Sequence, residues 1–133
     1  MKILLKNINI ISPGSKHHLS KRNILIDGGV IQKISDSDIS NKADEVFNGE
    51  GLYVSTGWFD IHVNFREPGN EYKEDLNSGC KAAIKGGFTG VLQMPSTEPC
   101  IGDRPRAEYI LQRSKSLPIH VHPAGVLTVD RNG

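Results

Sequence analysis

The sequence predicts an α/β chain, in which a small antiparallel sheet is followed by a strand–helix–strand–helix–strand series. Two observations predict this order. Residues 1–52 contain short apolar runs separated by turn residues and show no helical periodicity. In residues 53–133, strand-like alternation and helix-like spacing follow one another along the chain. Strands that alternate with helices form right-handed βαβ units with parallel strands, and such units carry their chemistry at the carboxyl ends of the strands.

The first half predicts a long strand and a tight hairpin. Residues 3–11 alternate isoleucine with asparagine near their end, which is the period of a half-buried strand, and the loop residues 12–15 end it. Two further apolar runs, 24–26 and 30–34, flank the sequence Asp-Gly-Gly at 27–29. Because glycine adopts positive φ without strain, this sequence favours a short turn between antiparallel strands.

The second half predicts three strands and two helices. In order, they are a strand at 59–65, a helix at about 73–85, a strand at 88–94, a helix capped by Asp103, and a strand from 118 to about 128. Alternate residues of a strand point the same way, so the first strand presents one polar face. The residues of this face are Asp60, His62, Asn64 and Arg66. Arg66, the Pro95–Thr97 turn and the region near Thr128 are expected on one rim of the sheet.

Composition and charge exclude several classes of function. The chain holds 16 Lys plus Arg against 15 Asp plus Glu, which argues against a nucleic-acid footprint or a polybasic membrane surface. No apolar run approaches the roughly 18 residues of a membrane span, and the N-terminal residues do not have the pattern of a secretory signal. Cys80 and Cys100 are too few for a disulfide scaffold and are expected as reduced thiols, so the cytoplasm is the default location.

Two histidine patterns could bind a metal ion. His62 and Asn64 lie two residues apart, the spacing at which two strand residues can face one ion, but a neutral amide oxygen is a weak ligand for zinc. His120 and His122 form an intact His-x-His, although no third ligand stands near them in the sequence. For each pattern the alternative is a structural histidine on a strand face, and the residues alone leave both interpretations open.

Polar residues after the predicted strands could bind a ligand. Arg66 follows the first strand and could hold a carboxylate through two parallel hydrogen bonds, or it could form a salt bridge with Glu67 or another neighbour. Ser96 follows the second strand, but the sequence shows no base that would make it a nucleophile. The acidic residues of the segment 71–75 are expected in the first turn of a helix, where the helix dipole favours negative charge.

Four motifs stand in a fixed order along the chain. They are GWFDIHVNFREPG at 57–69, EYKED at 71–75, GGFT at 86–89 and MP at 94–95. In this order they resemble the dihydroorotase family of the amidohydrolase superfamily. The resemblance extends over about residues 1–128, and the segment 60–69 is its most specific part. The chain is therefore identified as a member of this family.

The resemblance implies a fold and a reaction. The family's fold is a small β-sandwich, built from both chain ends, attached to a (β/α)8 barrel of the TIM type. Residues 1–52 would supply N-terminal strands of the sandwich. Residues 53–133 would supply the first three strands and two helices of the barrel, truncated at that point. The family reaction is the reversible, zinc-dependent cyclisation of N-carbamoyl-L-aspartate to dihydroorotate in pyrimidine biosynthesis.

The resemblance also implies roles for four residues. His62 corresponds to the first histidine of the family's His-x-His metal pair, and Arg66 to the arginine that holds the substrate carboxylate. The second histidine is expected at 64, where this sequence has Asn64, and a substrate-binding asparagine is expected at 96, where it has Ser96. The other metal ligands and the catalytic aspartate would lie beyond residue 133. No catalytic residue is therefore expected within this segment, and the segment alone is not expected to be active.

Three functions remain open. The first is dihydroorotase activity with Zn2+, on N-carbamoyl-L-aspartate or dihydroorotate as the small-molecule substrate. The second is a non-catalytic homologue that serves as a structural partner of aspartate transcarbamoylase, which the departures at 64 and 96 favour. The third is a cyclic amidohydrolase of the hydantoinase or allantoinase type, which the REPG sequence at 66–69 favours least. A homo-oligomer is expected, because an open sheet of three strands leaves its edges exposed.

Overall fold

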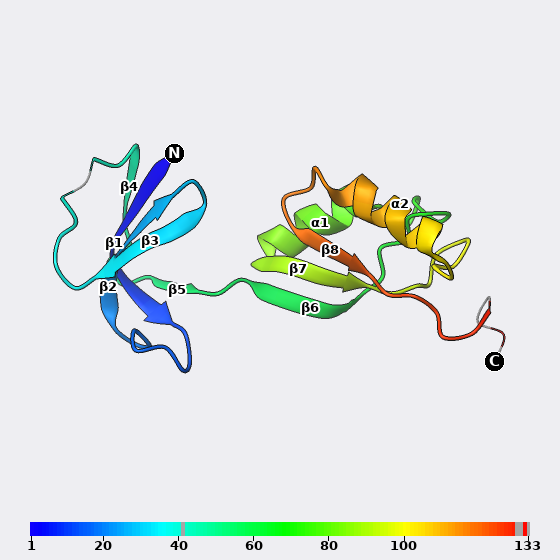
Figure 1. The fold of residues 1–133 in the computed structure, drawn as a ribbon, viewed down its shortest axis with the longest axis horizontal. Helices are drawn as coiled ribbons and strands as arrows, with labels where there is room; N and C mark the ends of the chain where they lie inside the picture. Colours follow the sequence, from blue (N-terminus) through cyan, green and yellow to red (C-terminus); the bar gives the residue numbers. More distant parts are fainter. Residues whose placement is uncertain (41, 130–131, 133) are drawn as a thin grey trace. The chain divides into compact units, whose positions relative to one another are not determined.

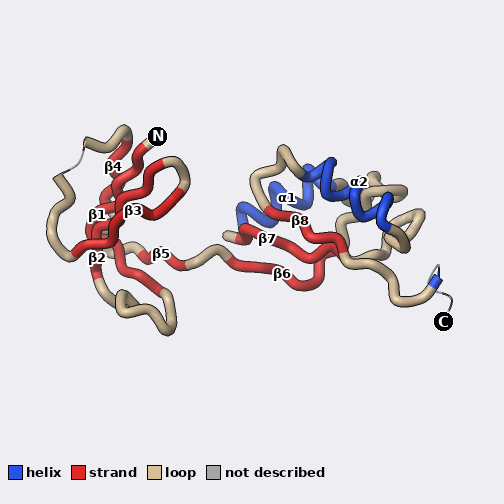
Figure 2. The backbone as a smooth tube through the Cα atoms, viewed as in Figure 1, coloured by secondary structure: helices blue, strands red, loops and turns tan. Residues whose placement is uncertain are grey.

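The computed structural model describes residues 1–40, 42–129 and 132, which form two compact units, Met1–Thr56 and Gly57–Gly133 (Figures 1 and 2). The division lies after the predicted boundary at 52/53. The reason is strand β5 (Tyr53–Ser55), which pairs with the end of the first strand and so belongs to the first unit.

The first unit is one mixed sheet of five strands. Besides β5, they are β1 (Lys2–Ile11), β2 (Lys21–Asp27), β3 (Val30–Ser35) and β4 (Glu45–Asn48), in the order β3-β2-β1-β4. β1, β2 and β3 are antiparallel neighbours, as predicted. β4 and β5 run parallel to β1, so the prediction of an antiparallel sheet is wrong for these two strands. The hairpin of β2 and β3 lies between β1 and β4 in the sequence, and this long connection allows the chain to re-enter the sheet in the direction of β1.

The predicted hairpin joins β2 to β3. Gly28 and Gly29 form its two-residue turn with φ angles of 58° and 81°, which glycine adopts without strain. The sheet buries apolar side chains of its first two strands. They are Leu4, Ile8, Ile10, Ile24 and Leu25.

The second unit is a parallel sheet of three strands with two helices. In chain order its elements are β6 (Trp58–Val63), α1 (Leu76–Lys85), β7 (Phe88–Gln93), α2 (Arg104–Ser114) and β8 (His120–Pro123), and the strands lie in the order β6-β7-β8. The predicted strand–helix–strand–helix–strand series is confirmed. Both helices pack against this sheet (Figure 1) through one apolar cluster. Its members include Leu76, Cys80, Val91, Ile110 and Val121.

Local hydrogen bonds set where the two helices begin. The Asp75 side chain accepts a bond from Ser78 N at 2.7 Å, and the Ser78 hydroxyl accepts one from Asp75 N at 3.2 Å. The first helix therefore begins at Leu76, and its predicted start near residue 73 is wrong. Asp103 caps α2 as predicted, because its side chain accepts a bond from Arg106 N at 3.0 Å.

Two predicted strands are too long. β6 ends at Val63 rather than 65, and its pairing with β7 shifts register between Asp60 and Val63. β8 ends at Pro123 rather than near 128, because β7, its partner, ends at Gln93 opposite Pro123. The carboxyl rim of the sheet therefore lies at Val63, Gln93 and Pro123, and Thr128 falls outside it. Within the described ranges, no helix is long and apolar enough to cross a membrane.

Candidate functional site

Three polar side chains meet just beyond the carboxyl ends of β6 and β7. Ser96 Oγ donates a hydrogen bond to Asn64 Oδ1 at 2.7 Å. Arg66 Nη1 lies 3.4 Å from both the carbonyl oxygen and the hydroxyl of Ser96, to which it donates. Asn64 and Arg66 belong to the loop after β6, and Ser96 belongs to the loop after β7. Because the two strands are parallel neighbours, their loops emerge side by side, and this brings the three residues together.

The charge of Arg66 is left available at this rim. The salt bridge with Glu67 that the sequence allows does not form, because Glu67 Oε1 lies 3.0 Å from Arg113 Nε instead. Arg66 makes no ion pair with any other described residue, and its half-buried guanidinium donates to neutral atoms of Ser96. A guanidinium has five N–H donors, so these long bonds leave donors for a carboxylate.

His62 lies on β6 with an exposed side chain. Its backbone N donates to Asp60 Oδ1 at 2.9 Å, at the point where the pairing with β7 shifts register. Asp60 and Val63 line the same cavity of about 200 Å³ beside α1, although a regular strand would place them on opposite faces. The predicted alternation from Asp60 to Arg66 is therefore wrong, because the register shift interrupts it and the strand ends at Val63.

The described residues do not fit a complete zinc site. Protein zinc sites take three or four ligands, chiefly imidazole, thiolate and carboxylate. Across the described ranges, no three His, Cys, Asp or Glu side chains gather closely enough to hold a metal ion. The amide oxygen of Asn64 already accepts a hydrogen bond from the Ser96 hydroxyl. The rim thus offers His62 as a ligand candidate, and any further ligands would have to come from other residues.

Among the described residues, neither the second histidine pattern nor Cys80 belongs to a group of side chains that could hold a metal ion. His120 and His122 are exposed on β8, and the His122 ring lies 5.5 Å from the Phe59 ring, centroid to centroid. Cys80 is fully buried, and burial raises the pKa of its thiol to about 11. A thiol of that pKa stays protonated near neutral pH and is a poor nucleophile and metal ligand.

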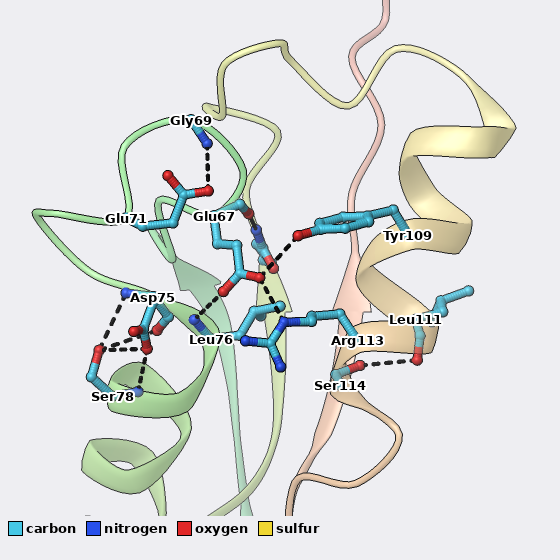
Figure 3. A network of polar contacts seen from close by, with 11 residues as sticks. Glu67, Gly69, Glu71, Asp75, Leu76, Ser78, Tyr109, Leu111, Arg113 and Ser114 are labelled. Carbon is cyan, nitrogen blue, oxygen red and sulfur yellow. Dashed lines mark hydrogen bonds and ion pairs between the residues drawn. The ribbon is translucent and has the colours of Figure 1, made fainter.

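A buried carboxylate directly after Arg66 connects the loop to both helices (Figure 3). Glu67 Oε2 accepts a hydrogen bond from Leu76 N at 3.0 Å. Glu67 Oε1 accepts from Tyr109 OH at 3.1 Å and from Arg113 Nε at 3.0 Å. Sequence reasoning missed this network, because Tyr109 and Arg113 lie 42 and 46 residues after Glu67. The four-residue spacing that puts them on one face of a helix was the available signal.

The loop after β6 is also bound to β7 and to the loop after it. Gln93 is fully buried, and its Nε2 donates to Phe65 O at 3.1 Å and to Glu67 O at 2.9 Å. Glu98 N donates to Pro68 O at 2.9 Å. These bonds hold the backbone on both sides of Arg66.

The sequence predicted that the acidic residues of 71–75 lie in the first turn of α1. This prediction is wrong, because the first turn of α1 contains no acidic residue. Glu71 accepts a hydrogen bond from Gly69 N at 2.9 Å within the loop, and Glu74 accepts one from the Ser78 hydroxyl. Asp75 is the cap itself. Hydrogen bonds from the Ser78 backbone and hydroxyl lower the pKa of Asp75, so the cap is charged at neutral pH.

Solved structures with the same fold are known. The chain is similar to an L-hydantoinase from Arthrobacter aurescens, with a TM-score of 0.80 at 20% identity over 92% of this chain and 27% of that one. It is similar to a dihydroorotase with a TM-score of 0.65 at 22% identity, over 97% of this chain and 32% of that one. These likenesses show the fold, because the strands and helices of this chain match part of each of these longer α/β chains. The predicted fold class is confirmed.

Sequence relatives show the family to which the chain belongs. Residues 51–133 match the family model described as dihydro-orotase-like, and the chain belongs to that family. The dihydroorotase of Aquifex aeolicus is 41% identical over 100% of this chain, and that of Carboxydothermus hydrogenoformans is 40% identical over 100% of it. The chain spans 31% and 30% of the lengths of these two relatives.

Proposed function

We propose that, within a protein as long as its relatives, this chain supplies the carboxylate-binding part of a dihydroorotase-like amidohydrolase. Arg66 would bind the carboxylate of N-carbamoyl-L-aspartate or dihydroorotate, and the reaction would be their reversible interconversion in pyrimidine biosynthesis. One observation supports this role above the others. The Arg66 guanidinium lies at the carboxyl rim beside Ser96, while Glu67, the nearest carboxylate in the sequence, is paired with Arg113.

The chemistry of arginine suits this role. A guanidinium is planar and permanently charged, and it can bind a carboxylate through two parallel hydrogen bonds. Ser96 accepts from one nitrogen of Arg66 and so restricts the orientation of the remaining donors. The formal net charge of the chain is only +1, so the attraction for an acidic ligand would come from this local charge.

Zinc enters the proposal through the family resemblance. His62 is the residue we propose as its ligand from this chain. Asn64 stands where the family resemblance leads us to expect the second histidine, and its side-chain oxygen accepts a hydrogen bond from Ser96. A complete zinc site would need two or three ligands from elsewhere in the protein. A cytoplasmic location and a homo-oligomeric assembly belong to the same proposal.

One observation favours a second candidate, a non-catalytic homologue that serves as a structural partner of aspartate transcarbamoylase. The two departures from the family pattern, Asn64 and Ser96, are in direct contact through a 2.7 Å hydrogen bond. A substituted metal-ligand position and a substituted substrate-binding position therefore satisfy each other. Such a pair stabilises the rim without metal, as expected for a site that has lost turnover.

The test measures zinc content and carbamoyl-aspartate cyclisation on the full-length protein. If the protein is an active dihydroorotase, we expect stoichiometric zinc and turnover. The Arg66→Ala variant should then lower kcat/KM by about a hundredfold, since it removes a charge-assisted hydrogen-bonded pair. Arg104→Ala, which removes an exposed arginine of α2, is the matched control and should leave kcat/KM unchanged. Turnover that survives Arg66→Ala at full kcat/KM would contradict the carboxylate-binding role.

The second candidate gives the opposite pattern. A non-catalytic homologue should contain no zinc and show no cyclisation, while Asn64→His should restore zinc binding, because it supplies the second imidazole. Zinc in the unmodified protein, together with turnover that depends on Arg66, would rule this candidate out.

A further inference from the structure

Glu67 is the only buried charged residue among those that the structure describes, with 4% of its surface exposed. Removing a carboxylate from water is costly unless hydrogen-bond donors replace the water. Three donors surround the Glu67 carboxylate: the N-terminal backbone of α1, the Tyr109 hydroxyl and the Arg113 guanidinium (Figure 3). The charge is stable only when the loop after β6 and both helices are in place together.

The position of Glu67 makes this network relevant to the candidate site. Glu67 directly follows Arg66, so the carboxylate fixes the chain one residue away from the guanidinium that we propose as the ligand-binding group. Gln93 Nε2 adds a second attachment, because it donates to the carbonyl oxygens of Phe65 and Glu67, one on each side of Arg66. The backbone of Arg66 itself is bonded on both sides, from its N to Glu74 O at 3.1 Å and from Asn70 N to its O at 2.9 Å.

The network also decides which arginine neutralises Glu67. Two guanidinium groups could pair with this carboxylate, that of the adjacent Arg66 and that of Arg113 on α2. The structure pairs it with Arg113, whose side chain is 44% exposed, while Arg66 stays beside Ser96. Burial and the hydrogen bond to Glu67 raise the pKa of Tyr109, so its hydroxyl keeps the proton that it donates. Every partner of the carboxylate is thus a donor, and Arg66 is not among them.

We propose that Glu67 is a positioning residue for Arg66. Its buried carboxylate, held by α1, Tyr109 and Arg113, fixes the backbone next to Arg66 and keeps the guanidinium free of an internal carboxylate. This inference rests on the proposed role of Arg66 in binding a ligand carboxylate. Glu67 itself touches no ligand, and its effect on affinity passes entirely through Arg66.

A double-mutant cycle on the full-length protein tests the proposal. Calorimetry gives the affinity for N-carbamoyl-L-aspartate of four proteins: unmodified, Glu67→Gln, Arg66→Ala and the double variant. Glu67→Gln keeps the size of the side chain but removes its charge. We expect affinity about tenfold weaker, because a displaced guanidinium would lose part of its charge-assisted hydrogen bonding to the ligand carboxylate. In the Arg66→Ala background the same change should have no further effect, since the two residues act as one unit.

Thermal unfolding of each variant separates positioning from folding. Binding is measured well below the melting temperature of every variant, so a folded protein is compared in each case. Tyr109→Phe removes one donor from a ring that is 45% exposed and should weaken binding by about threefold with the fold retained. Arg113→Lys keeps the charge and should lose less affinity than Arg113→Ala. Glu108→Gln, which breaks an exposed ion pair on the same helix, is the control and should leave affinity unchanged.

Three results would contradict the inference, and they differ in meaning. A lower melting temperature of Glu67→Gln with unchanged affinity would show that Glu67 only stabilises the fold. An equal loss of affinity from Glu67→Gln with and without Arg66 would show that it acts on the ligand by another route. Full affinity in Arg66→Ala alone would overturn the proposed function of Arg66, and the positioning role would fall with it.

Discussion

Among the described residues, the two units of the chain differ in whether an ion pair contains a buried carboxylate. The first unit has ion pairs at its surface, in each of which at least one side chain is 40% exposed or more. They are Lys2–Asp27, Lys6–Asp38 and Lys21–Glu50. In the second unit, the pair of Glu67 with Arg113 has a carboxylate that is only 5% exposed. Exposed pairs contribute little to stability because water and salt screen them, whereas a buried carboxylate depends on every one of its donors. The buried carboxylate of Glu67 thus lies next to the rim where the candidate site is built.

The largest expected effect compares two glycines with positive φ, one in each unit. At Gly69, φ is 99° and an added Cβ would come within 1.9 Å of Glu98 O in the loop after β7. At Gly14, φ is 83° and nothing lies within 4 Å of such a Cβ. Gly69→Ala should lower the free energy of unfolding by about 3 kcal/mol or more, because it adds a backbone clash to the strain of positive φ. Gly14→Ala should cost about 1 kcal/mol, from the strain alone.

Chemical denaturation of the full-length protein measures both changes. Equal losses for the two variants would mean that the positive φ alone sets the requirement for glycine. The close approach of the two loops at the rim would then contribute nothing to stability.

The second prediction compares a buried and an exposed carboxylate. Glu67→Ala leaves the backbone N of Leu76 and the Tyr109 hydroxyl without their acceptor, so the free energy of unfolding should fall by about 2–4 kcal/mol. Glu50→Ala breaks the exposed pair with Lys21 and should cost less than about 1 kcal/mol. Urea denaturation at low and high salt measures both. The loss from Glu67→Ala should persist at high salt, and a loss that salt abolished would contradict a buried network.

Much of this fold could be predicted from the sequence, because its signals are local. The Asp27-Gly28-Gly29 turn, the cap at Asp103 and the alternation of strands with helices depend on neighbouring residues, and the structure confirms all three. The errors lie where distant residues decide. The parallel direction of β4 and β5 depends on pairing with β1, and the end of β8 depends on the end of β7.

The candidate site could be predicted only in part, for the same reason. Arg66 and Ser96 could be named because each lies shortly after a strand, and parallel strands bring their carboxyl ends together. The partner of Glu67 could not be named, because an adjacent Arg66 and a distant Arg113 are equally suitable donors in a sequence. Packing of α2 against the sheet selects Arg113, and this choice leaves Arg66 available for a ligand.

The smallest expected effect compares two aspartates whose pKa values both lie below the ordinary value of 3.8. In the first unit, the hydrogen bond and the charge of Lys6 lower the pKa of Asp38. In the second, the backbone N–H of Ser78 is the largest cause for Asp75. Salt of roughly 1 M shortens the screening length to about 3 Å, so the pKa of Asp38 should rise towards 3.8 while that of Asp75 stays low.

A carboxylate whose pKa is lower in the folded state stabilises the protein at any pH above its pKa in the unfolded state. This stabilisation is lost as the pH falls through the pKa of the folded state. Carboxylate NMR titration at low and high salt measures the two pKa values directly. In unfolding experiments between neutral pH and the acid range, Asp38→Asn should remove a pH dependence that high salt also removes, whereas Asp75→Asn should remove one that persists in salt. Equal salt sensitivity would mean that the charge of Arg113, rather than the backbone of α1, controls Asp75. The second unit would then depend on surface charge as the first does, and the contrast between the units would be confined to Glu67.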